Sequence, residues 1–103
     1  MGRPKRWQAN PVRDLFDAAL QHYNIGAVCR RCPHRSILSA AGLWYLFERR
    51  NWPDRIGEAR RRLRCTSCGS RDAAIELVTG KPTLQSLELP DDREWKRAVS
   101  RRR

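Results

Sequence analysis

The sequence predicts a small α+β domain stabilised by a bound metal ion. In it, β-hairpin pieces carrying cysteine turns are separated by a helical insertion and preceded by an N-terminal helix. Three observations lead to this fold class. The chain has 103 residues, 40% of them hydrophobic, which suffices for one marginal core. Its four cysteines form two Cys-x-x-Cys pairs. Apolar residues recur at helical spacing before the first pair and again between the pairs.

The first helix is expected over residues 11–23. Asn10 followed by Pro11 is typical of an N-cap and a first helical position. The apolar residues that then recur at helical spacing are Leu15, Phe16, Ala19, Leu20 and Tyr23. Residues 1–9 have no such period and carry several basic side chains, so we expect a disordered basic arm there.

Residues 25–79 are expected to form a core built around the two cysteine turns. Short apolar-containing pieces at 25–29 and 35–38 flank the first turn, and we predict that they are the two arms of a small β-hairpin. Ser39 is placed to cap a second helix, which we expect to run to about Arg50.

A third helix and a further strand are predicted on either side of the second cysteine turn. Asp54 is expected to cap a short helix that ends near Leu63, because apolar residues between them share one side. Residues 73–79 alternate loosely between apolar and polar side chains, which indicates a strand.

These elements place a single domain at residues 10–79. Residues 80–103 would then be a C-terminal extension that is partly helical or disordered. Within it, residues 91–100 could form a helix with Trp95 and Val99 turned inward.

The strongest chemical signal is the pair of cysteine turns. Each Cys-x-x-Cys turn places two sulfurs on one side of a tight loop, and two such turns supply the four corners of a tetrahedron around one structural Zn²⁺. Gly69 directly follows the second turn, where a left-handed backbone is often needed. The predicted metal ligands are Cys29, Cys32, Cys65 and Cys68.

Other uses of the cysteines remain open at this stage. Four thiolates are also compatible with an iron–sulfur cluster. Disulfides are disfavoured by the lack of a secretion signal, and a thioredoxin-like redox motif would need a βαβ context that the sequence lacks. His34 could compete as a ligand, but four cysteines already complete the tetrahedron. We therefore expect it at the surface or beside the ligands.

Positive charge is concentrated around the cysteines. The formal net charge is +11, and residues 29–71 contribute +8 of it. Such a surface is either solvated or attracts a polyanion, most often nucleic acid. If both turns bind one metal ion, their arginines converge, and the arginine-rich third helix reaches the same place. The candidate phosphate contacts are Arg30, Arg31, Arg35, Arg60, Arg61, Arg62, Arg64 and Arg71.

The two cysteine segments, Cys-Arg-Arg-Cys-Pro-His-Arg and Arg-Leu-Arg-Cys-Thr-Ser-Cys-Gly-Ser-Arg, resemble a type of small bacterial zinc-ribbon-like protein. The resemblance covers about residues 25–79 and implies paired knuckles on β-hairpin pieces with a helical insertion between them. Pro33 stands where that pattern usually has glycine. Because such proteins are mostly uncharacterised, the resemblance implies a metal site and a fold rather than an activity.

The leading functional hypothesis is a zinc-ribbon module that binds DNA or RNA through an arginine-rich face. Trp7, Trp44 and Trp52 could stack on bases, although core positions suit them better. The alternative is an adaptor that docks on a larger complex or an acidic protein, using the segment around Trp44 and the leucines of 84–89. Without paired carboxylates, a phosphate loop or a triad, we expect neither an enzyme nor a small-molecule substrate.

A cytoplasmic protein without a membrane partner is the expectation for localisation. The apolar stretches are only a few residues long, far short of the ~20 that a membrane span needs. The N-terminal residues are charged and lack an apolar segment after them, which argues against a signal peptide.

Overall fold

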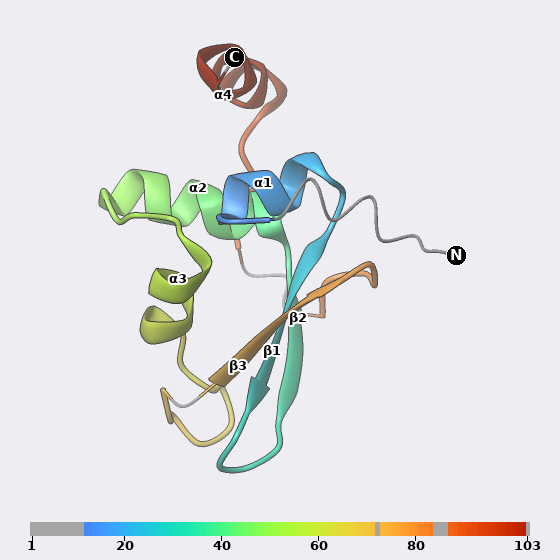
Figure 1. Cartoon of the computed structure of the whole chain (residues 1–103), viewed down its shortest axis with the longest axis vertical. Coiled ribbons are helices and arrows are strands. Elements are labelled where there is room, and N and C mark those ends of the chain that lie inside the picture. Colours follow the sequence, from blue (N-terminus) through green and yellow to red (C-terminus); the bar gives the residue numbers. More distant parts are fainter. Residues whose placement is uncertain (1–11, 72, 84–86, 103) are drawn as a thin grey trace.

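The computed structural model describes residues 12–71, 73–83 and 87–102 and shows a small α+β fold (Figure 1). The arm expected at residues 1–9, with Trp7, and the predicted Asn10–Pro11 cap lie outside the described residues. The described elements are α1 (Leu15–Leu20), β1 (Asn24–Cys29), β2 (Arg35–Leu38), α2 (Ala40–Arg50), α3 (Ile56–Arg62), β3 (Ala73–Val78) and α4 (Asp92–Arg102).

The three strands form an antiparallel sheet in the order β2-β1-β3. The predicted hairpin is confirmed, because β1 pairs with β2 in a register that sets Ile25 opposite Leu38. The predicted strand after the second cysteine turn is also confirmed, and it pairs with the other side of β1. This pairing places Cys29 opposite Ala73, so the start of β3 lies beside the end of β1.

Helix α1 is shorter than the expected helix over residues 11–23. It begins at Leu15, because the side chain of Asp14 accepts a hydrogen bond from the N–H of Asp17 at 2.8 Å and caps the helix. Val12 and Arg13 therefore precede the helix. The helix ends at Leu20, and His22 takes a left-handed conformation with φ of 66° in the turn that leads to β1.

The two helices of the insertion differ in how well the sequence predicted their start. Helix α2 begins after Ser39, whose side chain accepts the N–H of Gly42 at 3.1 Å, as expected. Helix α3 is preceded by Arg55, which makes no side-chain cap. The expected cap, Asp54, instead accepts the N–H of Phe16 at 3.2 Å and thereby ties the insertion to α1.

An aromatic cluster joins α1, α2 and α4. The ring centroid of Phe16 lies 5.3 Å from that of Trp44 and 5.0 Å from that of Trp95. Trp44 is only 7% exposed, in agreement with the core position that suited it better, so it offers little of the docking surface that the adaptor alternative assigns to its segment. Trp95 and Val99 pack against the core as expected, together with the buried Ala98.

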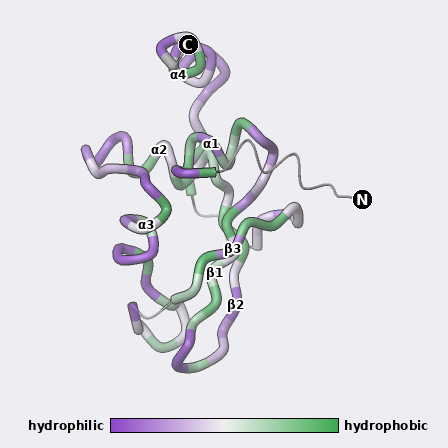
Figure 2. The backbone as a smooth tube through the Cα atoms, in the orientation of Figure 1, coloured by the Kyte–Doolittle hydropathy of each residue, from purple (hydrophilic) through white to green (hydrophobic). Residues whose placement is uncertain are grey.

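The cysteine turns lie at the opposite end of the sheet from α4, and α3 leads from the insertion to the second turn (Figure 1). Hydrophilic residues predominate along α3, whereas apolar residues predominate in β1 (Figure 2). Among the described residues, no helix has the length and apolar composition that crossing a lipid bilayer requires.

Candidate metal centre and its arginine surroundings

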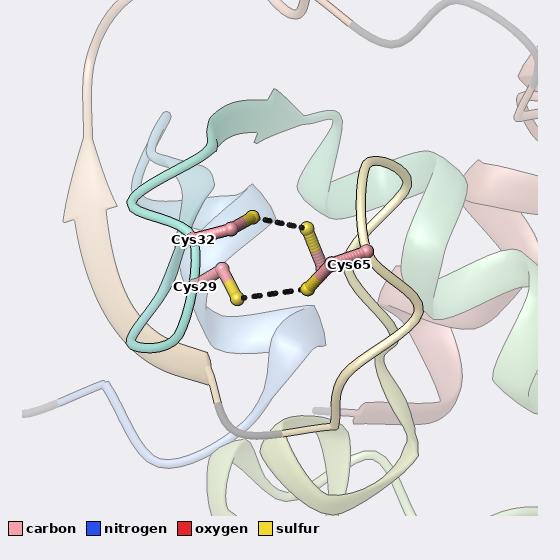
Figure 3. Close-up of side chains that lie close together, drawn as sticks. Cys29, Cys32 and Cys65 are labelled. Carbon is pink, nitrogen blue, oxygen red and sulfur yellow. Dashed lines mark hydrogen bonds between the residues drawn. The ribbon is translucent and has the colours of Figure 1, made fainter.

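Four cysteine sulfurs from the two turns come together at one place. Cys29 ends β1, Cys32 lies in the β1–β2 turn, and Cys65 and Cys68 belong to the turn after α3. All four sulfurs lie within 4.8 Å of one another. The shortest contacts run between the turns, at 3.4 Å for Cys32–Cys65 and 3.6 Å for Cys29–Cys68 (Figure 3). Such a cluster could hold one metal ion, as the spacing of the cysteines predicts.

The backbone of each turn favours thiolates at the first cysteine. N–H groups of Cys32 and, to a smaller extent, Arg31 lower the pKa of Cys29, against the opposing effect of burial. In the second turn, the N–H of Cys68 and then that of Ser67 lower the pKa of Cys65 to about 6. The N–H of Ser67 lies 3.3 Å from the Cys65 sulfur. Thiolates are the form in which cysteine binds metal ions, so both turns are prepared for ligation.

The fourth sulfur behaves differently. The N–H of Ser70 acts to lower the pKa of Cys68, but its sulfur contacts, first with Cys32 and also with Cys29 and Cys65, raise it to about 12. Hydrogen bonds to the neighbouring sulfurs, together with burial, thus favour a proton on the Cys68 thiol. Metal binding would displace that proton, so metal uptake is coupled to proton release.

The second turn has the conformation that its glycine allows. Gly69 has φ of 77°, the left-handed value expected after the second pair. Its N–H donates to the carbonyl of Cys65 at 2.9 Å, and the N–H of Cys65 donates to the carbonyl of Ser70 at 2.8 Å. These two bonds close the turn around the Cys65 and Cys68 sulfurs.

His34 connects the two turns without joining the sulfur cluster. Its Nε2 lies 3.1 Å from the hydroxyl of Thr66 and 3.2 Å from the hydroxyl of Ser36. Its carbonyl accepts the N–H of Cys29 at 2.9 Å. The role of Thr66 was missed from sequence, because the contact joins residues 32 positions apart.

Two of the predicted arginines share one surface feature. Arg31 and Arg71 line a hollow of about 530 Å³ together with Cys32, Cys68 and Gly69. Both arginine side chains are exposed, and neither forms an ion pair within the part of the chain that the structure describes. Arg30, in the first turn, is exposed as well.

The other predicted arginines divide into two groups. Arg35 pairs with Glu76 at 3.0 Å, and Arg61 and Arg62 pair with Glu58 at 3.6 and 3.0 Å. The guanidinium of Arg62 also lies 4.3 Å from the centre of the Trp52 ring. In contrast, the exposed Arg60 and Arg64 form no ion pair with any described carboxylate.

Comparison with known proteins found no family model that matches the chain, and no similar protein among curated sequences or solved structures.

Proposed function

We propose that the chain is a zinc-stabilised, zinc-ribbon-like module that binds nucleic-acid phosphates beside its metal centre. The observation that carries the proposal is the hollow in which Arg31 and Arg71, one from each cysteine turn, stand next to Cys32 and Cys68. Residues 40 positions apart reach this hollow only because both turns meet at the sulfur cluster.

Zinc is the proposed metal because of the donor set. Four cysteine sulfurs within 4.8 Å of one another suit a structural zinc site, in which Cys29, Cys32, Cys65 and Cys68 would leave no open coordination position. When bound, the ion supplies a cross-link between the turns, and its binding free energy becomes folding free energy. Metal analysis of freshly purified protein distinguishes zinc from iron.

Phosphate is the proposed ligand class because of the charge and shape of the side chains. Guanidinium groups bind phosphate oxygens through paired N–H donors. Arg31 and Arg71 form no ion pair with a carboxylate among the described residues, and neither do the exposed Arg60 and Arg64. The formal net charge of +11 adds long-range attraction to a polyanion.

The test uses the zinc-loaded full chain and fluorescein-labelled RNA and duplex DNA of matched sequence. Anisotropy titrations at several salt concentrations would compare the wild type with the double variant Arg31→Gln, Arg71→Gln. A charge-matched control, Arg93→Gln with Arg97→Gln, removes two exposed arginines from α4.

We expect the variant of the hollow to bind more weakly on all sequences, because phosphate contacts carry no sequence information. The slope of log affinity against log salt should fall by roughly 0.7–0.9 per lost contact. The α4 control should keep the wild-type slope. An equal loss of affinity and of salt slope in the two double variants would contradict the proposal, since it would mean that only the total charge matters.

A further inference from the structure

The two edges of the sheet differ in how their backbone groups are used. On the β2 edge, the N–H of Ile37 donates to the hydroxyl of Thr83 at 2.9 Å, and the N–H of Thr83 donates to the carbonyl of Ile37 at 2.8 Å. Thr83 therefore occupies both outward-facing groups of Ile37. The segment that follows β3 therefore covers this edge at Ile37.

The alternation of antiparallel pairing shows which groups face outward on β3. In an antiparallel pair, two opposite residues point their N–H and C=O groups either toward each other or away from each other. Ile37 points these groups away from β1, so its partner Gly26 points its own away from β2 and toward Glu76 of β3. Glu76 therefore faces β1, and its neighbours Ile75 and Leu77 face outward. Within the described residues, no hydrogen bond reaches the outward N–H or C=O of Ile75 or Leu77.

Side chains around this open edge favour an extended partner of negative charge. Leu77 is 39% exposed, and the only carboxylate within β3, Glu76, is already paired with Arg35. The exposed Arg71 precedes the strand, separated from it by Asp72, whereas Lys81 belongs to the segment that crosses from β3 to Ile37 on the β2 edge. Helix α3, with its exposed arginines, lies beside β3 (Figure 1).

We propose that the outer edge of β3 accepts an extended acidic segment of a partner protein as a fourth strand. Main-chain hydrogen bonds to Ile75 and Leu77 would hold the segment, and Arg71 together with the exposed arginines of α3, which contacts β3, would attract its carboxylates. A second copy of this chain fits poorly, because each copy would bring the same cations and a net charge of +11 to the edge. The inference goes beyond nucleic-acid binding and does not rest on it.

The first experiment titrates the ¹⁵N-labelled, zinc-loaded full chain with a synthetic peptide of alternating Thr and Glu. Two control peptides share its length: one with Lys in place of Glu, and one with N-methyl groups on alternate amides, which blocks strand pairing but keeps the charge. Amide hydrogen exchange reports directly on Ile75 and Leu77. We expect these two amides to become protected with the acidic peptide and with neither control.

The second experiment changes the edge itself. Leu77→Pro removes the outward N–H, and proline is tolerated where that N–H makes no ladder bond. Leu77→Thr is the matched control that keeps the N–H. We expect the proline variant to bind the acidic peptide about tenfold more weakly and the threonine variant to stay close to wild type. If the proline variant fails to fold, the N-methylated peptide still provides the decisive comparison.

Three outcomes would overturn the proposal. One is equal binding of the acidic peptide and its N-methylated form, which would mean attraction by charge alone. Another is saturation by the acidic peptide while Ile75 and Leu77 exchange as in the free chain. The third is protection of both amides in the peptide-free chain together with a dimer in sedimentation, which would assign the edge to a second copy.

Discussion

The helical end of the molecule and its cysteine end are held together by different forces. At the helical end, large apolar side chains such as Phe16 and Trp44 are at most 7% exposed, and their rings pack at a tilt of 52° between α1 and α2. At the cysteine end, Thr66, Ser67, Cys68 and Gly69 are all exposed. Hydrogen bonds within the turns and the sulfur cluster hold this end.

The difference follows from the chain's size. A domain of 103 residues buries too little surface to extend one apolar core from α4 to the second cysteine turn. A metal cross-link is the usual substitute for a missing core. We therefore expect the helical end to respond to changes in packing and the cysteine end to changes in ligation.

The largest effect is expected from Cys65→Ser. It removes one ligand, so bound zinc should fall from about one ion per chain to a small fraction, and the thermal midpoint of the whole chain should drop because metal binding is coupled to folding. Plasma emission spectrometry measures the bound zinc, and calorimetry measures the thermal midpoint. Ser67→Ala, in the same turn, keeps every sulfur and should keep the zinc. Normal folding of metal-free Cys65→Ser would show that the ion is incidental.

Phe16→Ala tests the helical end. The ring is 1% exposed and contacts Trp44 and Trp95, so its removal should lower the free energy of unfolding by about 3–5 kcal/mol. Leu89→Ala, at a side chain 59% exposed, should change it by less than about 0.5 kcal/mol. Urea unfolding checks both variants. Zinc stoichiometry in folded Phe16→Ala should stay at the wild-type value, and its loss would show that the two ends are not separable.

His34→Ala should leave about one zinc ion per chain but weaken its binding about tenfold, because the variant loses the contact that orients Thr66 while keeping all ligands. Competition with a chromogenic chelator measures the affinity. Thr66→Val removes the same contact from the other side. The double variant should bind zinc no more weakly than either single variant. Stoichiometric loss of zinc in His34→Ala would instead identify His34 as a ligand.

The smallest effect concerns the link between α2 and α4. Tyr45 donates its hydroxyl to Glu94 at 2.9 Å, and this bond, with burial and the carboxylate charge, raises the pKa of Tyr45. The raised pKa means that the folded state favours the neutral phenol. This contribution to stability is present below the unfolded pKa of about 10 and is lost as pH rises through the folded value.

Urea unfolding of wild type and Tyr45→Phe at about pH 8 and about pH 11 measures this contribution. The difference between the two proteins should shrink at the higher pH, because the phenol ionises there. A difference that stays constant with pH would show that the hydroxyl contributes nothing through its ionisation.

Local signals in the sequence were sufficient for much of the fold. The Ser39 cap of α2, the hairpin around the first cysteine turn and the left-handed Gly69 were predicted correctly, because each depends on residues within a few positions of one another. The same holds for the two cysteine pairs, whose spacing alone indicates a metal site.

Long-range contacts explain the predictions that failed. Asp54 was expected to cap α3, but it bonds Phe16, 38 positions away. A core position suited Trp44 better than an exposed one, but its partner, Trp95 of α4 at a centroid distance of 5.5 Å, was not identified from the sequence. A periodic pattern assigns a face to each helix, but it does not name the element that will pack against that face.

The sequence by itself determined which side chains are chemically available: four sulfurs in two tight turns and an excess of arginine around them. Only the tertiary structure decided which of these arginines line a common hollow and which form ion pairs. It brought Arg31 and Arg71 into one hollow, paired Arg35, Arg61 and Arg62 with carboxylates, and gave Ile75 and Leu77 at the outer edge of β3 no hydrogen-bond partner among the described residues. The physical reason is that ion pairs and strand order depend on distances between residues far apart in the chain, which spacing along the sequence does not encode.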